Sequence, residues 1–555
     1  MRTKRIRGAV ALTAAAVVAV ATAGCASERG EDGGGDENKP FIFAGAGDPE
    51  SLDPSLSTDG ETFRVTRQVL ETLLTHEVGG TEIVGGLAET WEQSEDGTVW
   101  TFHLREGVKF HDGEALTAEV VCANFDRWFN WEGTYQSSNF SAYWQDTFGG
   151  FAANENEQTP APNYKSCTAQ DELTPVIEVN EYSAKLPGGF TLASMGIHSP
   201  KSLEAYAAAE PPAEGDSLTY PTYSQEVGTV AGTGPFKYAE WNKGNREVTL
   251  ERNDEYWGEK AGVKTVIVRT ISDENARKQA LEAGDIHGYD LVAPQDVQPL
   301  LDAGFQVPTR GVFNLMYLGI TQEQNPALEK LEVRQALAHA LDRQKIVDTI
   351  LPEGGTVATQ FLAPTLDGWA EDVPTYDYNA DTAKGLLADA GEEDLTIDFC
   401  YPTEVTRPYM PAPKDIFESL KADLEAVGIT VNAKAMKWSP DYLTAVDASE
   451  CGIYLLGWTG DYNEAYNFMG TWFANYQGAW GFENEEIFDA LAEVNTEPDP
   501  ATRVEMYKEI NALIMEYVPG VPISHSPPSI AFSPDVNPPT TSALTQEQFA
   551  EISWK

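Results

Sequence analysis

The chain has 555 residues, of which 42% are hydrophobic and 22% charged, so it is long enough for several domains and apolar enough to bury their cores. These values exclude a wholly disordered chain and a fibre. Its 87 acidic and 37 basic residues give a formal net charge of −50, which would repel a phosphate backbone or an anionic membrane surface. We therefore expect no nucleic-acid partner.

The first 24 residues are typical of an export signal rather than of a folded domain. Four basic residues precede an uncharged run rich in Ala and Val that extends from Gly8 to Gly24. The run is shorter than the ~20 residues of a spanning helix and ends in small residues, which favours cleavage over anchoring. Residues 1–24 contain four basic and no acidic side chains, so the chain that remains after cleavage carries a formal charge of −54.

Cys25 follows this run directly. Small residues that lead into a cysteine at this point resemble a bacterial lipoprotein signal, in which the cysteine is lipidated and becomes the first residue. Thr22 departs from the aliphatic residue usual in that pattern, and the alternative is plain secretion with cleavage nearby. Residues 25–39 are rich in Gly and charge, which predicts a flexible tether. No second apolar run of ~18 residues follows, so we expect a body held at the outer face of the cytoplasmic membrane without spanning it.

Four further cysteines stand in a chain expected to enter a disulfide-permissive compartment: Cys122, Cys167, Cys400 and Cys451. They include no CxxC spacing, which argues against a zinc or thioredoxin-type site. Three pairings are formally possible. Distance along the sequence favours Cys122 with Cys167 and Cys400 with Cys451, and the alternative is that the cysteines are free and buried.

Residues 311–520 are predicted to form an open α/β lobe with a largely parallel sheet. Residues 395–401 alternate as a strand, residues 413–427 have helical apolar spacing, and residues 429–435 alternate again. This order predicts a β-α-β unit. The apolar run 453–456 predicts another buried strand of the same sheet.

Two polar loops follow the strands predicted at 395–401 and 453–456. The first contains Arg407, and the second contains Asp461 beside Trp458. Ligands bind outside the carboxyl ends of parallel strands, so a cation and an anion would face one crevice if both strands lie parallel in one sheet. That arrangement suits a zwitterion with separated ends. The alternative is that Arg407 and Asp461 pair with each other or lie in solvent.

Several segments carry a more specific pattern. They are Ser51 to Pro54, Thr58 to Gly60, Gly86 to Trp91, Ser94 to Gly97, Thr101 to Gly113, Gly232 to Phe236, Arg252 to Trp257, Val333 to Leu337 and Gly457 to Asp461. In this order they resemble the family 5 extracellular solute-binding proteins, the peptide receptors of bacterial ABC importers. Most of these stretches also have an ordinary reading as scaffold, since Trp100, Phe102 and Leu104 alternate as one buried strand face. We expect His103 and His111 to be structural and expect no metal site.

The resemblance implies an α/β fold of the two-lobed periplasmic-binding-protein type (class II, cluster C), with two crossing strands and a subdomain inserted in lobe I. On this chain, the implied segments are residues 40–80, 183–310 and 521–555 for lobe I, 81–182 for the subdomain, and 311–520 for lobe II. Both members of each favoured cysteine pair then fall in the same part, which agrees with the local pairing.

The resemblance also implies a binding site. Dipeptide-type members hold the ligand's C-terminal carboxylate with an arginine in an Arg-Pro-Tyr loop and its α-amine with the aspartate of Gly-Trp-Thr-Gly-Asp. These roles fall on Arg407 and Asp461. Further candidate ligand-binding residues are Trp458 as an apolar wall, Tyr409, Gly460, and the lobe I loop Thr58, Asp59 and Gly60. The segment 462–466 departs from the family pattern.

The function implied is that of a monomeric receptor that captures short peptides between its lobes and delivers them to an ABC permease in the membrane. The resemblance implies no cofactor. The alternative is the same transport role with a metal chelate, haem, opine or oligosaccharide. The sequence has no GxSxG, HExxH or P-loop motif, so we do not expect an enzyme. A pure adhesion or chaperone-like role is a third hypothesis.

Overall fold

The computed structural model describes residues 36–157, 159–213 and 218–555, which belong to one compact unit. The predicted signal peptide 1–24, the predicted lipidation site Cys25 and most of the predicted tether lie outside the described residues. None of the helices in the described ranges is long and apolar enough to cross a membrane.

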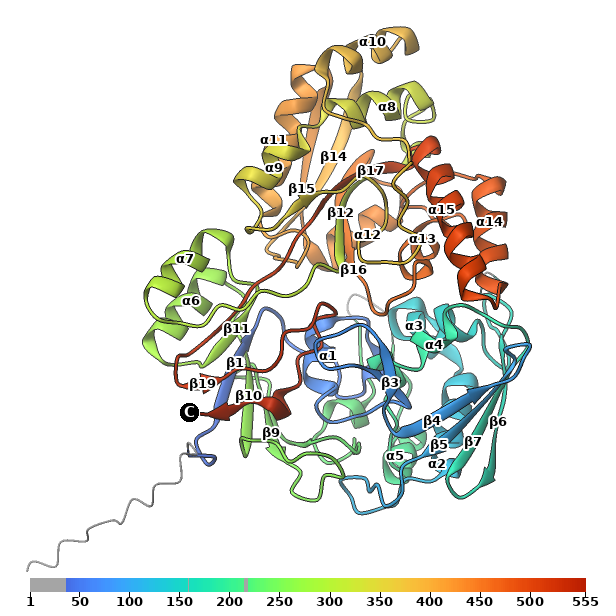
Figure 1. Cartoon of the computed structure of the whole chain (residues 1–555), viewed down its shortest axis with the longest axis vertical. Helices are drawn as coiled ribbons and strands as arrows, with labels where there is room; N and C mark the ends of the chain where they lie inside the picture. Colours follow the sequence, from blue (N-terminus) through green and yellow to red (C-terminus); the bar gives the residue numbers. More distant parts are fainter. Residues whose placement is uncertain (1–35, 158, 214–217) are drawn as a thin grey trace, which may run out of the picture. The chain divides into compact units, whose positions relative to one another are not determined.

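A six-stranded sheet of order β18-β11-β1-β10-β9-β8 forms the first lobe. Its strands are β1 (Phe41–Gly45), β8 (Phe236–Asn242), β9 (Glu247–Arg252), β10 (Thr265–Thr270), β11 (Gly288–Asp290) and β18 (Ile530–Phe532). Strand β1 runs parallel to β10 and β11, and the other neighbours are antiparallel. Segments from the beginning, middle and end of the chain therefore share one sheet (Figure 1).

Short helices and hairpins accompany this sheet. They are α1 (Gly60–Thr66), α4 (Leu186–Gly189), α5 (Pro200–Ala208), α6 (Glu274–Ala283), α7 (Pro294–Asp302), β2 (Leu74–His76) with β3 (Ile83–Gly85), and β19 (Val536–Asn537) with β20 (Ser553–Trp554). Helix α1 begins after Asp59, whose side chain accepts hydrogen bonds from the N–H groups of Glu61 and Thr62, both at 3.0 Å. The carboxylate thereby satisfies two of the free N–H groups at the start of the helix.

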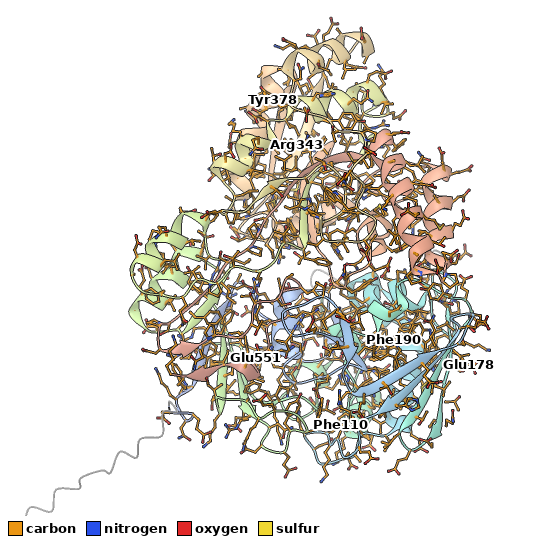
Figure 2. The ribbon with its side chains drawn as sticks, in the orientation of Figure 1. Phe110, Glu178, Phe190, Arg343, Tyr378 and Glu551 are labelled. Atoms are coloured by element: carbon orange, nitrogen blue, oxygen red, sulfur yellow. A yellow bond between two sulfur atoms is a disulfide. The ribbon has the colours of Figure 1, made fainter. Side chains whose placement is uncertain are left out.

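A separate antiparallel sheet of order β4-β5-β7-β6 forms the subdomain. Its elements are β4 (Ala88–Gln93), β5 (Val99–Leu104), β6 (Tyr164–Asp171), β7 (Thr174–Val179), α2 (Ala118–Phe129) and α3 (Ser138–Phe148). The predicted alternation along β5 is confirmed, because Trp100, Phe102 and Leu104 are buried. Figure 2 labels Phe190, whose ring centroid lies 4.9 Å from that of Phe102 in the same core.

The second lobe contains a six-stranded sheet of order β13-β17-β12-β16-β14-β15. Its strands are β12 (Asn314–Ile320), β13 (Thr356–Val357), β14 (Thr396–Thr403), β15 (Thr430–Lys437), β16 (Ile453–Thr459) and β17 (Gly520–His525). Its helices are α8 (Leu331–Ala340), α9 (Arg343–Thr349), α10 (Ala380–Ala390), α11 (Pro413–Ala426), α12 (Leu443–Asp447), α13 (Tyr466–Phe473), α14 (Glu485–Thr496) and α15 (Pro500–Tyr517). The predicted β-α-β unit is confirmed, since β14 lies parallel to β15 and α11 connects them.

The prediction of a largely parallel sheet is wrong. Only β14 runs parallel to its neighbours, β15 and β16, whereas β12 is antiparallel to both β16 and β17. The reason is the path between the lobes. Gln306 pairs with Phe532 and Thr309 with Ser529 in the antiparallel sense, and β12 continues this pairing with β17. One segment enters the second lobe beside the segment that leaves it, so the two must run in opposite directions.

One predicted boundary also differs. The sequence analysis ends lobe II at residue 520, but Gly520–His525 forms strand β17 of the second lobe's sheet. The chain returns to the first lobe's sheet only at β18, which pairs with β11. The return segment therefore contributes to both lobes.

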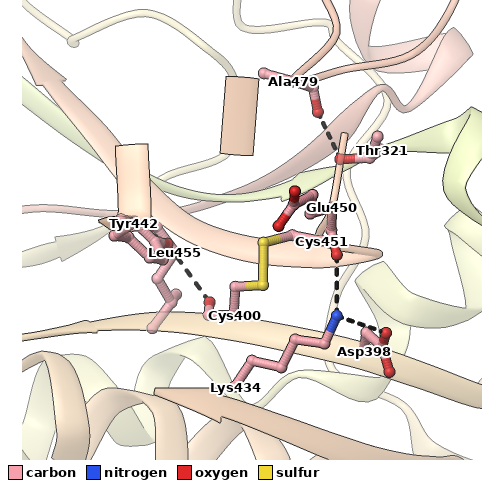
Figure 3. The surroundings of a disulfide bond; sticks show 9 residues. All are labelled: Thr321, Asp398, Cys400, Lys434, Tyr442, Glu450, Cys451, Leu455 and Ala479. Carbon is pink, nitrogen blue, oxygen red and sulfur yellow. Dashed lines mark hydrogen bonds and ion pairs between the residues drawn. A yellow bond between two sulfur atoms is a disulfide. The ribbon is translucent and has the colours of Figure 1, made fainter. Parts of the chain in front are cut away.

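Two disulfides link neighbouring elements, and they are the pairs that the sequence analysis favours. Cys122 in α2 bonds to Cys167 in β6, with a Cα–Cα distance of 5.0 Å, and Cys400 in β14 bonds to Cys451, with a Cα–Cα distance of 5.7 Å. Figure 3 shows the second disulfide, which ties β14 to Cys451, two residues before β16 begins at Ile453. Lys434 of β15 donates a hydrogen bond to the Glu450 carbonyl at 3.1 Å beside it.

Candidate functional site

Arg407 lies in a tight turn after β14. The N–H of Arg407 donates to the Met410 carbonyl at 3.2 Å, and the N–H of Met410 donates to the Arg407 carbonyl at 2.9 Å. Pro408 occupies the second position of the turn, where its fixed φ is favoured. Tyr409 and Met410 are buried in the core of the second lobe. The predicted ligand residue Tyr409 packs against Gly457, where an added Cβ would lie 2.4 Å from the ring, so we interpret it as a residue that positions the turn.

The guanidinium of Arg407 has no acidic partner in direct contact. Its carbon Cζ lies 4.5 Å from the centroid of the Trp438 ring, an arrangement favourable for a cation. Within the described ranges, no carboxylate lies within 4.0 Å of it, and its buried Nε has no hydrogen-bond acceptor. Arg407 lines a small cavity together with Leu291 and Val292 of the first lobe. It is therefore a cation at the junction of the lobes whose buried Nε is unused by the described residues.

Asp59 is the acidic group that faces Arg407 from the first lobe. Burial raises the pKa of Asp59 to about 6; the positive charge of Arg407 opposes this shift, and Glu50 and Glu61 reinforce it. The flanking residues Thr58 and Gly60 are exposed, and an added Cβ at Gly60 would meet open space. Of the predicted lobe I loop, Asp59 is thus the residue that acts electrostatically on the Arg407 turn.

Asp461 lies two residues after the end of β16 at Thr459, and two contacts fix the backbone of Gly460 and Asp461. The N–H of Gly460 donates to the Phe313 carbonyl at 3.0 Å, and the N–H of Asp461 donates to Oδ1 of Asn467 at 2.8 Å. A Cβ at position 460 would lie 2.2 Å from the Phe313 ring, so only glycine fits there. Trp458 donates from Nε1 to the same Asn467 oxygen at 3.3 Å. No motif in the sequence marks Asn467, although it orients both predicted residues.

Among the described residues, one of the two carboxyl oxygens of Asp461 has a hydrogen-bond donor and the other has none. The hydroxyl of Tyr143, from the subdomain, donates to Oδ1 at 3.1 Å, whereas Oδ2 is buried with no hydrogen-bond partner among the described residues. Burial raises the pKa of Asp461 to about 7; hydrogen bonds from Tyr143 and Asn467 and the charge of Arg67 oppose the shift. A buried carboxyl with a free oxygen is suited to accept a hydrogen-bonding cation.

A cavity of about 20 Å³ lies at Asp461 between the lobes. It is lined by Phe63, Arg67, Tyr143, Leu192, Ala193, Ser194, Asp461 and Gln546. This volume holds about one water molecule and is too small for an amino-acid residue. A ligand that reaches Asp461 must therefore enter while the lobes are further apart.

The structure brings the Arg407 and Asp461 loops to the same edge of one sheet. Strands β14 and β16 are neighbours and parallel, with Phe399 opposite Ile453, so the predicted parallel relation is confirmed. In the described part of the chain, no hydrogen bond or ion pair joins Arg407 to Asp461, and the two line different cavities. Among the described residues there is also no cluster of three His, Cys, Asp or Glu side chains that could hold a metal ion.

The sequence matches the family model of bacterial extracellular solute-binding proteins, family 5 (middle), over residues 82–480. The chain belongs to this family. This family 5 protein is 28% identical over 504 residues to the dipeptide-binding protein of Escherichia coli (strain K12), with 88% of this chain and 89% of the relative covered. It is 26% identical over 532 residues to heme-binding protein A of Haemophilus influenzae, with 93% and 92% covered.

Solved structures confirm the two-lobed fold of this family 5 solute-binding protein. The dipeptide-binding protein from Pseudoalteromonas sp. SM9913, in complex with Met-Leu, superposes with a TM-score of 0.78 at 22% identity and covers 93% of this chain and 100% of that chain. This coverage includes both lobes.

Proposed function

We propose that this solute-binding protein captures peptides of two or three residues between its lobes and delivers them to an ABC permease. The observation that carries the proposal is the pair of unused charged groups at the lobe junction. In the described part of the chain, Nε of Arg407 has no acceptor and is available to a terminal carboxylate, and Oδ2 of Asp461 has no donor and is available to a terminal ammonium. A peptide supplies both complements at a fixed separation, whereas a singly charged ligand supplies one.

The first-lobe neighbours of Arg407 and Asp461 lie at the two ends of helix α1. Asp59, at its start, attracts Arg407, and Arg67, at its end, lines the cavity that contains Asp461. At 1.5 Å per residue, these ends are roughly 12 Å apart. An extended dipeptide of about 6 Å to 7 Å with a hydrogen bond of about 2.8 Å at each end spans a similar distance. This agreement supports a short peptide over a long one.

Burial gives the binding its strength. Binding removes each terminal charge of the peptide from water. Each charge is compensated only while its lobe II partner, Arg407 or Asp461, and the first lobe together enclose it. Contacts available only in the closed arrangement drive the lobes together about the two crossing segments. Closure is thereby coupled to the presence of a ligand with both termini free, and the closed receptor is the form that we propose the permease accepts.

Calorimetric titration with Ala-Ala and its two blocked forms tests the proposal. We expect Ala-Ala to bind, and N-acetyl-Ala-Ala and Ala-Ala amide to bind at least about 30-fold more weakly, since each leaves one buried charge unpaired. Arg407→Gln should lose discrimination against the amide alone, and Asp461→Asn should lose discrimination against the acetylated peptide alone.

The matched control for charge removal is Lys437→Gln, because Lys437 lies at the same edge of the sheet with its side chain 65% exposed. We expect this variant to bind all three peptides as the unaltered protein does. Unchanged affinity for Ala-Ala in both Arg407→Gln and Asp461→Asn would remove the clamp from consideration.

A non-peptide cargo is the competing hypothesis, and the similarity to heme-binding protein A of Haemophilus influenzae is the observation that favours it. Titration with haemin, followed by its Soret absorbance, separates the two. Saturable haemin binding together with no calorimetric signal for any dipeptide would identify haem, and not a peptide, as the cargo.

We also propose that the body acts as a monomer tethered through a lipid on Cys25. The support is the order of basic residues, apolar run and cysteine at the start of the sequence. Expression in a bacterium fed a labelled fatty acid should label the protein, and Cys25→Ala should abolish the label and release the protein from the membrane fraction. A labelled Cys25→Ala variant would contradict this assignment.

A further inference from the structure

A second arginine at the lobe junction, Arg67, is not used by the clamp. It is the C-cap residue directly after α1, and it lines the cavity that contains Asp461. Its Nε donates to the Phe63 carbonyl at 3.0 Å, one turn back along the helix. In the described part of the chain, no carboxylate lies within 4.0 Å of its guanidinium. The cation therefore faces the cavity with most of its donors unused.

Two buried arginines, Arg310 and Arg343, have more acceptors than the half-buried Arg67. Arg310 pairs with both Asp290 and Glu547, at 2.6 Å in each case. Arg343 donates to three backbone carbonyls. Arg67 receives only the more distant charges of Glu547 and Asp461, and burial lowers its pKa to about 10 despite them. Arg67 is half-buried, and the donors that are unused among the described residues can bind an anion that enters the cavity.

Ser194 supplies a second unused donor to the same cavity. It is 3% exposed, and its hydroxyl has no hydrogen-bond partner among the described residues. A hydroxyl and a guanidinium that converge on one small space form a suitable pair of donors for a carboxylate. The remaining acidic group of the cavity, Asp461, is the one that the proposed function assigns to the ligand's ammonium.

Binding of a peptide ammonium to Asp461 changes the balance of charge around Arg67. It neutralises the nearest acidic group in the cavity and adds a second cation beside the guanidinium. A carboxylate on the side chain of the same ligand residue would restore neutrality, and it lies within a few bonds of the ammonium. We propose, resting on the proposed function, that Arg67 and Ser194 form a subsite selective for peptides whose first residue is acidic.

The same argument predicts no preference for an acidic second residue. The second residue lies toward the Arg407 end of α1, where Asp59 is joined by Glu50 and Glu61. Arg407 itself is assigned to the terminal carboxylate. An additional carboxylate there would meet acidic neighbours without a free cation, so the preference is confined to the first position.

Calorimetric titration with Glu-Ala, Gln-Ala, Ala-Glu and Ala-Gln at pH 8 tests the subsite. We expect the unaltered protein to bind Glu-Ala about tenfold more tightly than Gln-Ala, since only the former supplies the missing anion, and to bind Ala-Glu no more tightly than Ala-Gln. Arg67→Gln should abolish the preference for Glu-Ala over Gln-Ala, and Ser194→Ala should reduce this preference in part.

The outcomes distinguish failure of the proposed subsite from failure of the proposed peptide-binding function. Equal binding of Glu-Ala and Gln-Ala by the unaltered protein, or a preference that survives in Arg67→Gln, overturns the subsite and leaves the peptide clamp intact. Failure of all four dipeptides to bind overturns the peptide function itself. The comparison within the unaltered protein decides the matter even if Arg67→Gln does not fold.

Discussion

At the scale of single residues, the lobe junction contains carboxyl groups whose ionised forms are destabilised by burial. The pKa values are raised to about 6 for Asp59 and about 7 for Asp461. A raised pKa in the folded protein means that the structure is favoured when the group is protonated and loses stability as the pH rises through that value. The protein therefore keeps groups that reduce its stability at neutral pH, as expected of binding residues.

Asp461→Asn should stabilise the protein at pH 8 by on the order of 2 kcal/mol, because it removes a buried charge and keeps an oxygen acceptor for Tyr143. The gain should be full above about pH 7 and shrink as the pH falls toward the ordinary value of a carboxyl group near 4. Thermal unfolding of both proteins across this range measures it.

The control for this prediction is Asp96→Asn. Hydrogen bonds from Ser94 and Thr98 lower the pKa of the exposed Asp96, so its replacement should give no stabilisation at pH 8. A gain for Asp461→Asn that is the same at every pH would show that the charge is not its cause.

Gly460 matters because of space rather than because of ligand contact. Gly460→Ala should cost about 1 to 3 kcal/mol of stability and weaken peptide binding, since the added Cβ would press on the buried Phe313 ring and move Asp461. Chemical denaturation measures the loss. Gly60→Ala is the matched control, because its Cβ enters open space, and it should leave the unfolding midpoint nearly unchanged. Equal midpoints for the two variants would contradict the packing argument.

At the scale of elements, the site depends on two neighbouring parallel strands, β14 and β16. Each ends beside the other, so the loops that follow them carry Arg407 and Asp461 to one edge of the sheet. The disulfide joins Cys400, within β14, to Cys451, which lies two residues before β16 begins (Figure 3). The disulfide thus constrains the two strands whose following loops carry Arg407 and Asp461.

Replacing Cys400 and Cys451 together by Ala should destabilise the protein by about 4 kcal/mol, because the unfolded chain regains the freedom of a loop closed over a separation of 51 residues. Calorimetric unfolding measures the change. The double Ala variant of Cys122 and Cys167, which are separated by 45 residues, should lose a similar amount of stability. It should keep its affinity for Ala-Ala, because this disulfide lies outside β14 and β16. An unfolding temperature insensitive to loss of the Cys400–Cys451 bond would refute the first expectation.

At the scale of the whole molecule, contacts remote from Arg407 and Asp461 hold the lobes together. Asn495 of α14 accepts a hydrogen bond from the Ser183 hydroxyl at 2.9 Å on its side chain and from the Ala184 N–H at 2.8 Å on its backbone. Arg503 of α15 donates to the Tyr182 hydroxyl at 2.9 Å. These contacts join α14 and α15 to the loop after β7, and they exist only while the lobes are close.

Asn495→Ala should therefore shift the protein toward a more open arrangement. We expect a larger radius of gyration in solution scattering and an affinity for Ala-Ala reduced about threefold to tenfold, because one interlobe hydrogen bond of about 1 kcal/mol is lost. Thr496→Ala is the control, since its hydroxyl bonds to the Glu493 carbonyl within α14. An equal loss of affinity for Ala-Ala in Thr496→Ala would show that a change in helix α14, and not loss of the interlobe contact, causes the weaker binding.

Features that depend on local periodicity could be predicted from the order of the residues. The β-α-β unit of β14, α11 and β15 and the buried face of β5 follow from apolar spacing that any packing partner would satisfy. The parallel order of β14 and β16 placed the Arg407 and Asp461 loops at one edge, because such strands end together.

The other groups that surround these two residues could not be predicted, because long-range folding brings them together. Tyr143, which donates to Asp461, lies 318 positions away in the chain, and Arg67 reaches the same cavity from the other lobe. The mixed order of the second sheet likewise comes from the antiparallel crossing segments rather than from any strand's composition. Contacts between lobes depend on how two separately packed bodies meet, and no local pattern of residues encodes that meeting.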